Sequence, residues 1–284
     1  MNQTALITGA SSGIGRALAQ QFAAHGYDVV LVARNSGTLE EVARTLSGLR
    51  QGSGPARHSE AQAAGPRREA DKPRATAVRV MTADLAKTGS AVALVDQLRQ
   101  SGIQVDVLVN NAGFGLQGEF TELPFDEQVE MIQLNVVTLT ELTRLLLPGM
   151  LQRRTGGVLN VASTAAFQPG PLMSVYYATK AFVLSFTEGV AEEVAGSGVK
   201  VTCLCPGPTA TAFADRAGMR GTNLFKGGTM NVESVAREGF EGWNSGKVVV
   251  IPGAANRRGA LVVRLSPRGF VRRVVKRLNS NAAS

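Results

Sequence analysis

Two side chains with complementary acid–base chemistry stand four residues apart in the stretch SVYYATKAF, residues 174–182. On a helix, Tyr176 and Lys180 would lie on one face, one turn apart. An ammonium beside a phenol favours the phenolate, so we expect Lys180 to lower the pKa of Tyr176 from its usual value near ~10. A tyrosine tuned in this way can exchange a proton with a carbonyl or alcohol oxygen. The same spacing also fits an ordinary amphipathic helix with a solvated lysine. Motifs elsewhere in the chain are needed to distinguish a catalytic pair from ordinary packing.

A glycine-rich turn near the N-terminus predicts an anion-binding site. The apolar run 3–8 leads into Gly9, Gly13 and Gly15, and a helical pattern follows. Glycines let the backbone approach a ligand closely. The free N–H groups at the start of the helix then favour an anion, for which a dinucleotide pyrophosphate is the natural occupant. An ordinary tight turn between a strand and a helix is the alternative.

The end of the second predicted strand, residues 28–34, indicates which dinucleotide would bind. Dinucleotide-binding folds place an acid at this position to take the adenosine ribose hydroxyl of NAD. Here the strand ends at Ala33 and Arg34, and Asp28 lies at its other end. A guanidinium supplies the counter-charge for a 2′-phosphate. We therefore expect NADP(H) as the cofactor, with a plain surface arginine as the alternative.

Small and polar residues follow the later predicted strands, where ligands bind in open parallel sheets. Asn135 falls in a predicted helical region, where a buried asparagine needs partners. The residues that we expect at the crevice are Asp84, Leu85, Asn110, Asn111, Gly113, Ser163, Pro206, Gly207, Thr209 and Thr211.

Strand and helix patterns alternate along the chain, which predicts an α/β fold with a doubly wound parallel sheet of seven strands in one domain, residues 1–253. Residues 50–75 lack apolar periodicity and are expected to form a partly disordered surface insertion. Residues 214–230 are expected to form a substrate lid. Predicted strands cover 3–8, 28–34, 76–82, 105–113, 156–167, 199–213 and 247–253, and predicted helices after the first cover 38–49, 89–101, 124–151, 174–195 and 232–245.

Composition is typical of a soluble globular protein, since 44% of the 284 residues are hydrophobic and 18% are charged. We find neither an apolar run of the ~18–20 residues that span a bilayer nor a signal peptide. Cys203 and Cys205 are expected to be free thiols on opposite sides of a strand, which suits a reducing cytoplasm.

Positive charge is concentrated at the C-terminus. Residues 1–241 carry 21 basic and 22 acidic residues, whereas residues 242–284 carry nine basic and no acidic ones. This distribution does not indicate nucleic-acid binding. Residues 254–284 form a basic helical extension, in which Phe270, Val271, Val274, Val275 and Leu278 are expected to share one helical face. Such a helix would dock on the body or on a second subunit, attach to a membrane surface, or meet an acidic carrier protein.

Together these motifs resemble the short-chain dehydrogenase/reductase family over residues 3–253. The resemblance implies a Rossmann-like fold and a homodimer or homotetramer. Tyr176 would be the general acid or base, Lys180 would also bind the nicotinamide ribose, Ser163 would bond the substrate carbonyl, and Asn135 would hold a relay water. Cofactor contacts are implied for Ser11, Ser12, Ile14 and Ala112 as well. The matching residues are Thr8-Gly9-x-x-x-Gly13-x-Gly15, Asn110-Asn111-Ala112-Gly113, Asn135, Ser163, Tyr176-x-x-x-Lys180 and Pro206-Gly207.

The predicted function is an NADP(H)-dependent oxidoreductase that interconverts a small-molecule carbonyl and an alcohol, without a metal. Ser12 stands where many NADP-preferring family members carry a basic residue, so the preference for NADP could be less strict. An NADP-binding scaffold without turnover and a 3-oxoacyl reductase linked to acyl carrier protein are the alternatives. We expect a cytoplasmic protein, with peripheral membrane attachment as the alternative.

Overall fold

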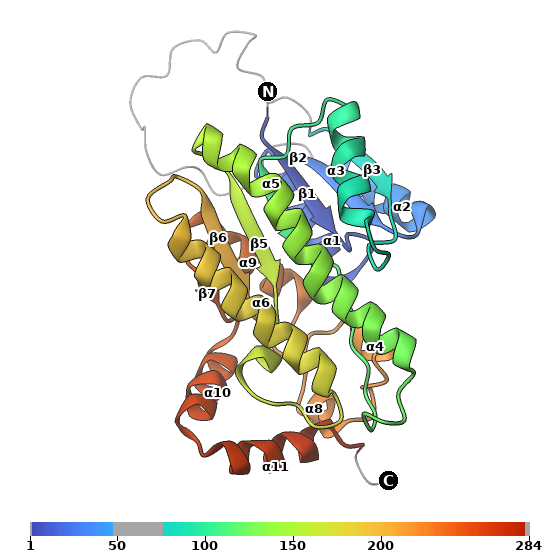
Figure 1. Ribbon diagram of the computed structural model, residues 1–284, viewed down its shortest axis with the longest axis vertical. Coiled ribbons are helices and arrows are strands. Elements are labelled where there is room, and N and C mark those ends of the chain that lie inside the picture. The colour runs from blue at the N-terminus through green and yellow to red at the C-terminus, as the bar shows by residue number, and fades with distance from the viewer. Residues whose placement is uncertain (1, 48–75, 282–284) are drawn as a thin grey trace.

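The computed structural model describes residues 2–47 and 76–281. The predicted insertion at 50–75 lies outside the described residues. The predicted sheet of seven parallel strands is present, and its strand order is β3-β2-β1-β4-β5-β6-β7 (Figure 1). The strands are β1 (Thr4–Thr8), β2 (Asp28–Ala33), β3 (Val78–Thr82), β4 (Val107–Asn110), β5 (Gly157–Val161), β6 (Lys200–Leu204) and β7 (Val249–Val250).

The central strands β1, β4 and β5 are buried on both faces and are therefore mainly apolar rather than alternating, whereas the edge strand β3 is partly exposed. Ile7, Leu31 and Val109 face one helical layer, α1 (Gly13–Ala24), α2 (Ser36–Ser47) and α9 (Val232–Asn244). Leu6 and Leu108 face the other layer, α3 (Ser90–Gln100), α5 (Leu139–Arg153) and α6 (Ser174–Glu193). Figure 1 shows α5 and α6 in front of the sheet.

The chain reverses direction across the sheet between β1 and β4. It runs outward from β1 to β3 and then returns to β4 on the other side of β1. Ligands of open parallel sheets bind at such a switch point, beyond the carboxyl ends of the strands. The fold therefore places the glycine turn after β1 beside the asparagines after β4.

The helix predicted over 124–151 is not continuous. It divides into α4 (Phe125–Ile132), a π-helical turn η2 (Gln133–Thr138) and α5. Such π turns inside α-helices are frequent at functional sites. Here the turn contains Asn135, whose amide bonds both backbone groups of Phe114 in the loop after β4. This anchor joins the helix to the edge of the crevice.

The end of the chain folds into two helices, α10 (Ala254–Leu265) and α11 (Arg268–Asn279). The predicted apolar face of α11 is only partly buried, because Val271 and Val275 are buried whereas Phe270 and Val274 are exposed. Positions 271, 275 and 279 follow the four-residue spacing of one helix face, and Phe270 and Val274 lie beside that face. No helix of the described ranges is long and apolar enough to cross a membrane.

The predicted orientation of the two cysteines is also wrong. Cys203 and Cys205 are free thiols whose Sγ atoms lie 3.7 Å apart in one buried cluster. Residues two apart on an extended chain point to the same side, so both thiols lie on one face of the strand.

Candidate active site

The glycine turn after β1 has no room for a side chain at Gly9 or Gly15. Gly9 and Gly13 adopt positive φ angles of 65° and 53°. A Cβ atom on Gly9 would lie 2.8 Å from the Asn111 amide nitrogen, and one on Gly15 would collide with the Gly9 carbonyl. The turn is thus shaped to leave its backbone open to the cavity, as the sequence pattern predicts.

Asn111 ties this turn to β4. Its Nδ2 atom donates to the carbonyl oxygens of Thr8 at 3.0 Å and Gly9 at 3.2 Å. The Thr8 hydroxyl accepts from the backbone N–H groups of Asn111 and Ala112, at 3.0 Å each. Thr8 was not among the predicted site residues, although it stands in the motif. Its hydroxyl links the end of β1 to the residues that follow β4 and so fixes their relative positions.

Asn110 does not lie at the crevice, contrary to the prediction. It is buried on the opposite side of β4, where Nδ2 donates to Thr143 Oγ1 at 3.1 Å and to Asn160 Oδ1 at 3.0 Å. Successive strand residues point to opposite faces, so Asn110 and Asn111 cannot both reach the cofactor side. Asn110 stabilises the interior instead.

One cavity of about 410 Å³ joins the glycine turn to the Tyr176 helix. Three predicted site residues do not line it: Asn110, and also Gly15 and Asn135, which are buried behind its wall. The other predicted residues all line this cavity: Gly9, Ser11, Ser12, Gly13, Ile14, Arg34, Asp84, Leu85, Asn111, Ala112, Gly113, Ser163, Tyr176, Lys180, Pro206, Gly207, Thr209 and Thr211.

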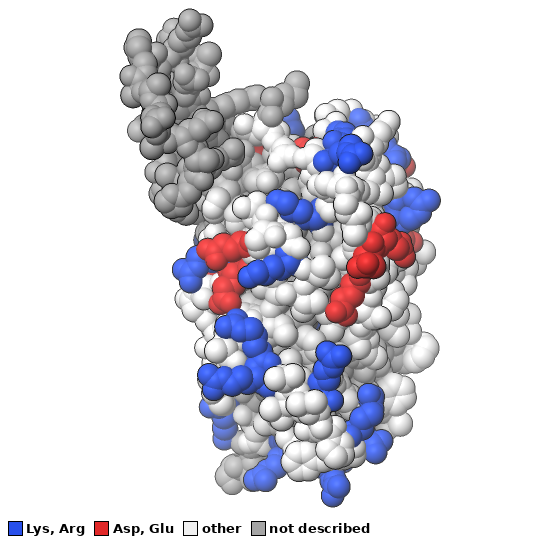
Figure 2. Space-filling view, turned by 90° about the vertical axis from the view of Figure 1, so that its left-hand side faces the viewer, with Lys and Arg blue, Asp and Glu red and all other residues white. Residues whose placement is uncertain are grey.

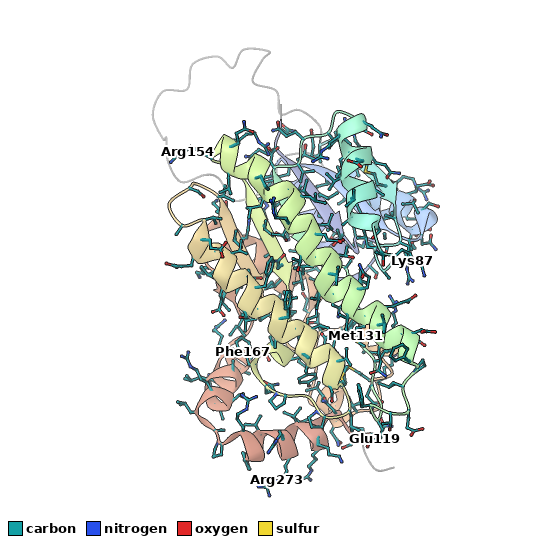
Figure 3. The ribbon with its side chains drawn as sticks, in the orientation of Figure 1. Lys87, Glu119, Met131, Arg154, Phe167 and Arg273 are labelled. Carbon is teal, nitrogen blue, oxygen red and sulfur yellow. The ribbon has the colours of Figure 1, made fainter. Side chains whose placement is uncertain are left out.

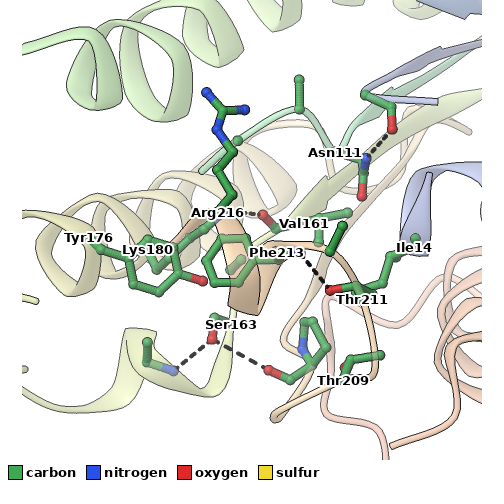
Figure 4. A pocket seen from close by; sticks show the side chains of 18 of the residues that line it. Ile14, Asn111, Val161, Ser163, Tyr176, Lys180, Thr209, Thr211, Phe213 and Arg216 are labelled. Carbon is green, nitrogen blue, oxygen red and sulfur yellow. Dashed lines mark hydrogen bonds between the residues drawn. The ribbon is translucent and has the colours of Figure 1, made fainter. Parts of the chain in front are cut away.

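Tyr176 and Ser163 meet in the part of the cavity shown in Figure 4. Ser163 Oγ accepts from the backbone N–H of Ala165 at 3.1 Å, which holds the hydroxyl at the end of β5. Burial raises the pKa of Tyr176 well above its usual value, and a hydrogen bond with Ser163 opposes that rise. The phenol therefore keeps its proton at neutral pH.

The predicted effect of Lys180 on this pKa is wrong. The Lys180 ammonium lies 5.8 Å from the centre of the Tyr176 ring and donates to the Val161 carbonyl oxygen at 2.9 Å. Burial lowers the pKa of Lys180 to about 8. Desolvation, which the sequence spacing does not reveal, outweighs the attraction between the two groups.

Asn135 has its side chain fully engaged. Oδ1 accepts from the Phe114 N–H at 3.2 Å, and Nδ2 donates to the Phe114 carbonyl at 2.9 Å and to Thr179 Oγ1 at 3.1 Å. It therefore braces the loop after β4 against α6. Its role in a water relay stays a prediction.

The C-terminal helix forms a wall of the same cavity, which the sequence did not predict. Val275 and Leu278 of α11 line it. Asn279 is fully buried and accepts from the Tyr177 hydroxyl at 3.1 Å, while its own amide donates to the Pro171 carbonyl at 3.0 Å. The only available signal was the four-residue spacing of positions 271, 275 and 279.

A second arginine also reaches the cavity. Arg216 lies on α7 (Phe213–Arg216), the first of two short helices, with α8 (Asn223–Lys226), in the predicted lid. Its guanidinium stacks 4.3 Å above the Phe114 ring (Figure 4 shows its position). Burial, with a contribution from the charge of Arg34, lowers the pKa of Arg216. Neither arginine forms an ion pair with any described residue.

Comparison with known proteins agrees with this geometry. A sequence profile described as short chain dehydrogenase matches residues 3–57 and 56–220. An uncharacterized oxidoreductase of Bacillus subtilis strain 168 is 33% identical over 206 residues, 72% of this chain and 68% of the relative. A very-long-chain 3-oxoacyl-CoA reductase of Anas platyrhynchos is 32% identical over 216 residues, 74% of this chain and 61% of that protein.

A solved structure is similar over nearly the whole chain. The short-chain dehydrogenase of Sphingobium yanoikuyae, determined in complex with NADPH, has a TM-score of 0.74 and 31% sequence identity, covering 95% of both chains. The resemblance stated from the motifs is thus confirmed by the profile, the relatives and the fold. The chain belongs to the short-chain dehydrogenase/reductase family and is an oxidoreductase of that family.

Proposed function

We propose that this protein reduces an apolar carbonyl compound with NADPH, or oxidises the corresponding alcohol, with Tyr176 as the general acid or base. The observation that carries the proposal is the continuous cavity, which has Arg34 and the glycine turn at one end and Tyr176 with Ser163 at the other. One molecule the length of a dinucleotide would bridge these two groups.

The residues present fit NADP(H). Gly9, Ser11, Ser12 and Gly13 line the cavity where α1 begins, so the backbone N–H groups of this turn can approach a pyrophosphate. Arg34 would hold the 2′-phosphate, and Arg216 offers a second guanidinium from the lid. Lys180 would bond the nicotinamide ribose. The complex of a similar dehydrogenase with NADPH supports the choice of cofactor.

When bound, the cofactor supplies the hydride that adds to the carbonyl carbon. Tyr176 then gives its phenolic proton to the carbonyl oxygen, which becomes the alcohol hydroxyl. Ser163 Oγ would donate a hydrogen bond to that oxygen as its negative charge develops. Lys180, whose ammonium lies 5.8 Å from the centre of the Tyr176 ring, would help return a proton to the phenolate.

The substrate end of the cavity is apolar, which favours a bulky hydrophobic carbonyl compound. Its walls come from the lid and from α11. The lining residues of this kind are Phe213, Met219, Leu224, Phe225, Val275 and Leu278.

A 3-oxoacyl thioester is the second candidate substrate. The relative from Anas platyrhynchos is named as a very-long-chain 3-oxoacyl-CoA reductase, and an apolar wall would suit an acyl chain. Thioesters on coenzyme A and on acyl carrier protein should be compared. Activity on carrier-bound substrates that salt abolishes, with free substrates unaffected, would favour a carrier-linked reductase.

The test is a panel of ketones, aldehydes, alcohols and 3-oxoacyl thioesters, followed by nicotinamide absorbance with NADPH and with NADH. We expect turnover with apolar members and NADPH. If NADPH binds but the whole panel gives no turnover, and Tyr176→Phe changes nothing, then the chain is a scaffold that only binds the nucleotide.

A further inference from the structure

Helices α10 and α11 carry a basic surface that the proposed reaction does not use. We call it the hairpin face. Arg257 pairs with Glu238 at 3.7 Å, but the seven other basic residues make no ion pair with any described residue. Figure 2 shows only blue charged side chains over the lower part of the visible side. The seven are Arg258, Arg264, Arg268, Arg272, Arg273, Lys276 and Arg277, and all are exposed.

Large apolar side chains stand exposed among these cations. Leu265 is 78% exposed and Phe270 57%, and they flank the turn between the two helices. Leu261 and Val262, one turn earlier on α10, are 59% and 60% exposed. Scattered single apolar residues need no explanation, but a cluster at one corner indicates an interaction site.

The hairpin face is also hollowed. A cavity of about 550 Å³ lies between α10 and the end of the 3-10 helix η3 (Thr164–Phe167), whose Phe167 is seen beside α10 in Figure 3. Its wall is apolar at Phe167, Leu261 and Val263, and it is charged at Arg264 and Arg268. This mixture fits an amphipathic anion.

We propose that the hairpin face binds peripherally to the surface of an anionic phospholipid bilayer. Leu265 and Phe270 would enter the boundary between head groups and acyl chains, while the guanidinium groups contact phosphates. Arg273 points away from the body at the lower end of the molecule in Figure 3, as a membrane contact requires.

Other binding partners would match only some of the charged and apolar groups of the hairpin face. A second copy seated face to face would bring two sets of unpaired cations together, which is electrostatically unfavourable. A nucleic acid would pair the arginines but leave the exposed leucines and Phe270 in water. A bilayer surface meets both the charged and the apolar groups.

Membrane binding does not depend on the proposed reaction, but the membrane-binding face lies close to the substrate end of the cavity. The outer side of α11 carries Arg272 and Arg273, whereas Val275 and Leu278 line the catalytic cavity. A bilayer seated on the hairpin face would therefore lie within one helix of the apolar substrate end.

The test is co-sedimentation of the full chain with vesicles of phosphatidylcholine alone and of an equimolar mixture with phosphatidylglycerol. We expect binding to the mixed vesicles only, weakened by high salt. The double change Arg272→Gln and Arg273→Gln should weaken partitioning about tenfold or more, because each lost cation removes part of the attraction. Leu265→Ser with Phe270→Ser should weaken it as well.

The matched control carries Arg144→Gln and Arg237→Gln, which remove the same charge from exposed positions elsewhere. It should bind like the wild type, and thermal melting should show that all variants fold. Equal binding to both vesicle types, equal losses in test and control variants, or no binding would each overturn the proposal. So would a dimer in solution that the hairpin variants dissociate. No readout uses turnover, so the enzymatic proposal stands or falls separately.

Discussion

The hydroxyl of Tyr177 donates a hydrogen bond to Asn279 Oδ1 at 3.1 Å, joining residues 102 positions apart. Tyr177 is the neighbour of Tyr176 on α6, and Asn279 is the last residue of α11. The bond therefore holds the C-terminal wall of the cavity against the helix that carries the proposed proton donor. Gln117 adds to it by donating to the Asn279 carbonyl at 3.1 Å.

We predict that Tyr177→Phe loosens this wall. Loss of the hydroxyl leaves Asn279 Oδ1 buried without its donor, a change that costs ~1–3 kcal/mol. Thermal melting should show a lower Tm. KM for apolar substrates should rise, while kcat changes less. An unchanged Tm and KM would show that α11 is held by its apolar contacts alone.

In contrast to Tyr177→Phe, the Tyr176→Phe variant should change kcat more than binding. Removing the proton donor should reduce kcat by the ~10²–10⁴-fold that general acid catalysis contributes. NADPH affinity, measured by fluorescence titration, should stay close to that of the wild type. Because Tyr177→Phe alters the adjacent ring in the same way, the pair separates chemistry from positioning. Full turnover in the Tyr176 variant would exclude the proposed mechanism.

Arg34→Ala and Arg216→Ala should each weaken NADPH binding about 10- to 150-fold, as expected for loss of a hydrogen bond to a charged group worth ~1.5–3 kcal/mol. If Arg34 contacts the 2′-phosphate, its loss should leave NADH binding unchanged and so remove the preference between the two cofactors. Arg16→Ala is the matched control, since Arg16 is exposed on α1 and does not line the cavity. A retained preference for NADPH in the Arg34 variant would show that this arginine does not select the cofactor.

The lowered pKa of Lys180, about 8, predicts a pH dependence. As the pH rises through this value the ammonium loses its charge, so NADPH affinity should fall. The Lys180→Met variant should bind NADPH weakly and show no such decline. Tyr176 should cause no further change in NADPH affinity near neutral pH, because burial raises its pKa and the phenol stays protonated there. Isothermal titration across the alkaline range checks both statements.

The same group affects stability with the opposite sign. An unfolded lysine keeps its proton up to ~10.4, whereas folded Lys180 releases it near about 8. Between these pH values the unfolded chain binds more protons than the folded one. The contribution of Lys180 therefore increases the free energy of unfolding, and so stabilises the fold, as the pH rises through that window. The free energy of unfolding, measured by chemical denaturation, should be compared between the wild type and Lys180→Met. The difference, wild type minus variant, should rise with pH over this range. A difference that is flat with pH would contradict the burial of this lysine.

Local patterns predicted the features that depend on near neighbours in the chain. Apolar runs separated by helical patterns predicted seven parallel strands, and the structure has them. The spacing of Gly9 and Gly13 predicted a turn open to a ligand, and both adopt positive φ. Tyr176 and Lys180 share a helix face because a helix repeats every ~3.6 residues. These relations are set by backbone geometry, so a short sequence contains them.

The tertiary structure decided what depends on burial and on distant contacts. Asn110 and Asn111 are adjacent in the chain, but only the position of the sheet shows that one is interior and the other lines the cavity. The spacing of Tyr176 and Lys180 predicted the wrong direction for the tyrosine pKa, because desolvation comes from the whole surrounding fold. Asn279 reaches Tyr177 only because the folded chain returns α11 to the cavity. Burial is a property of the packed chain, and no local spacing encodes it.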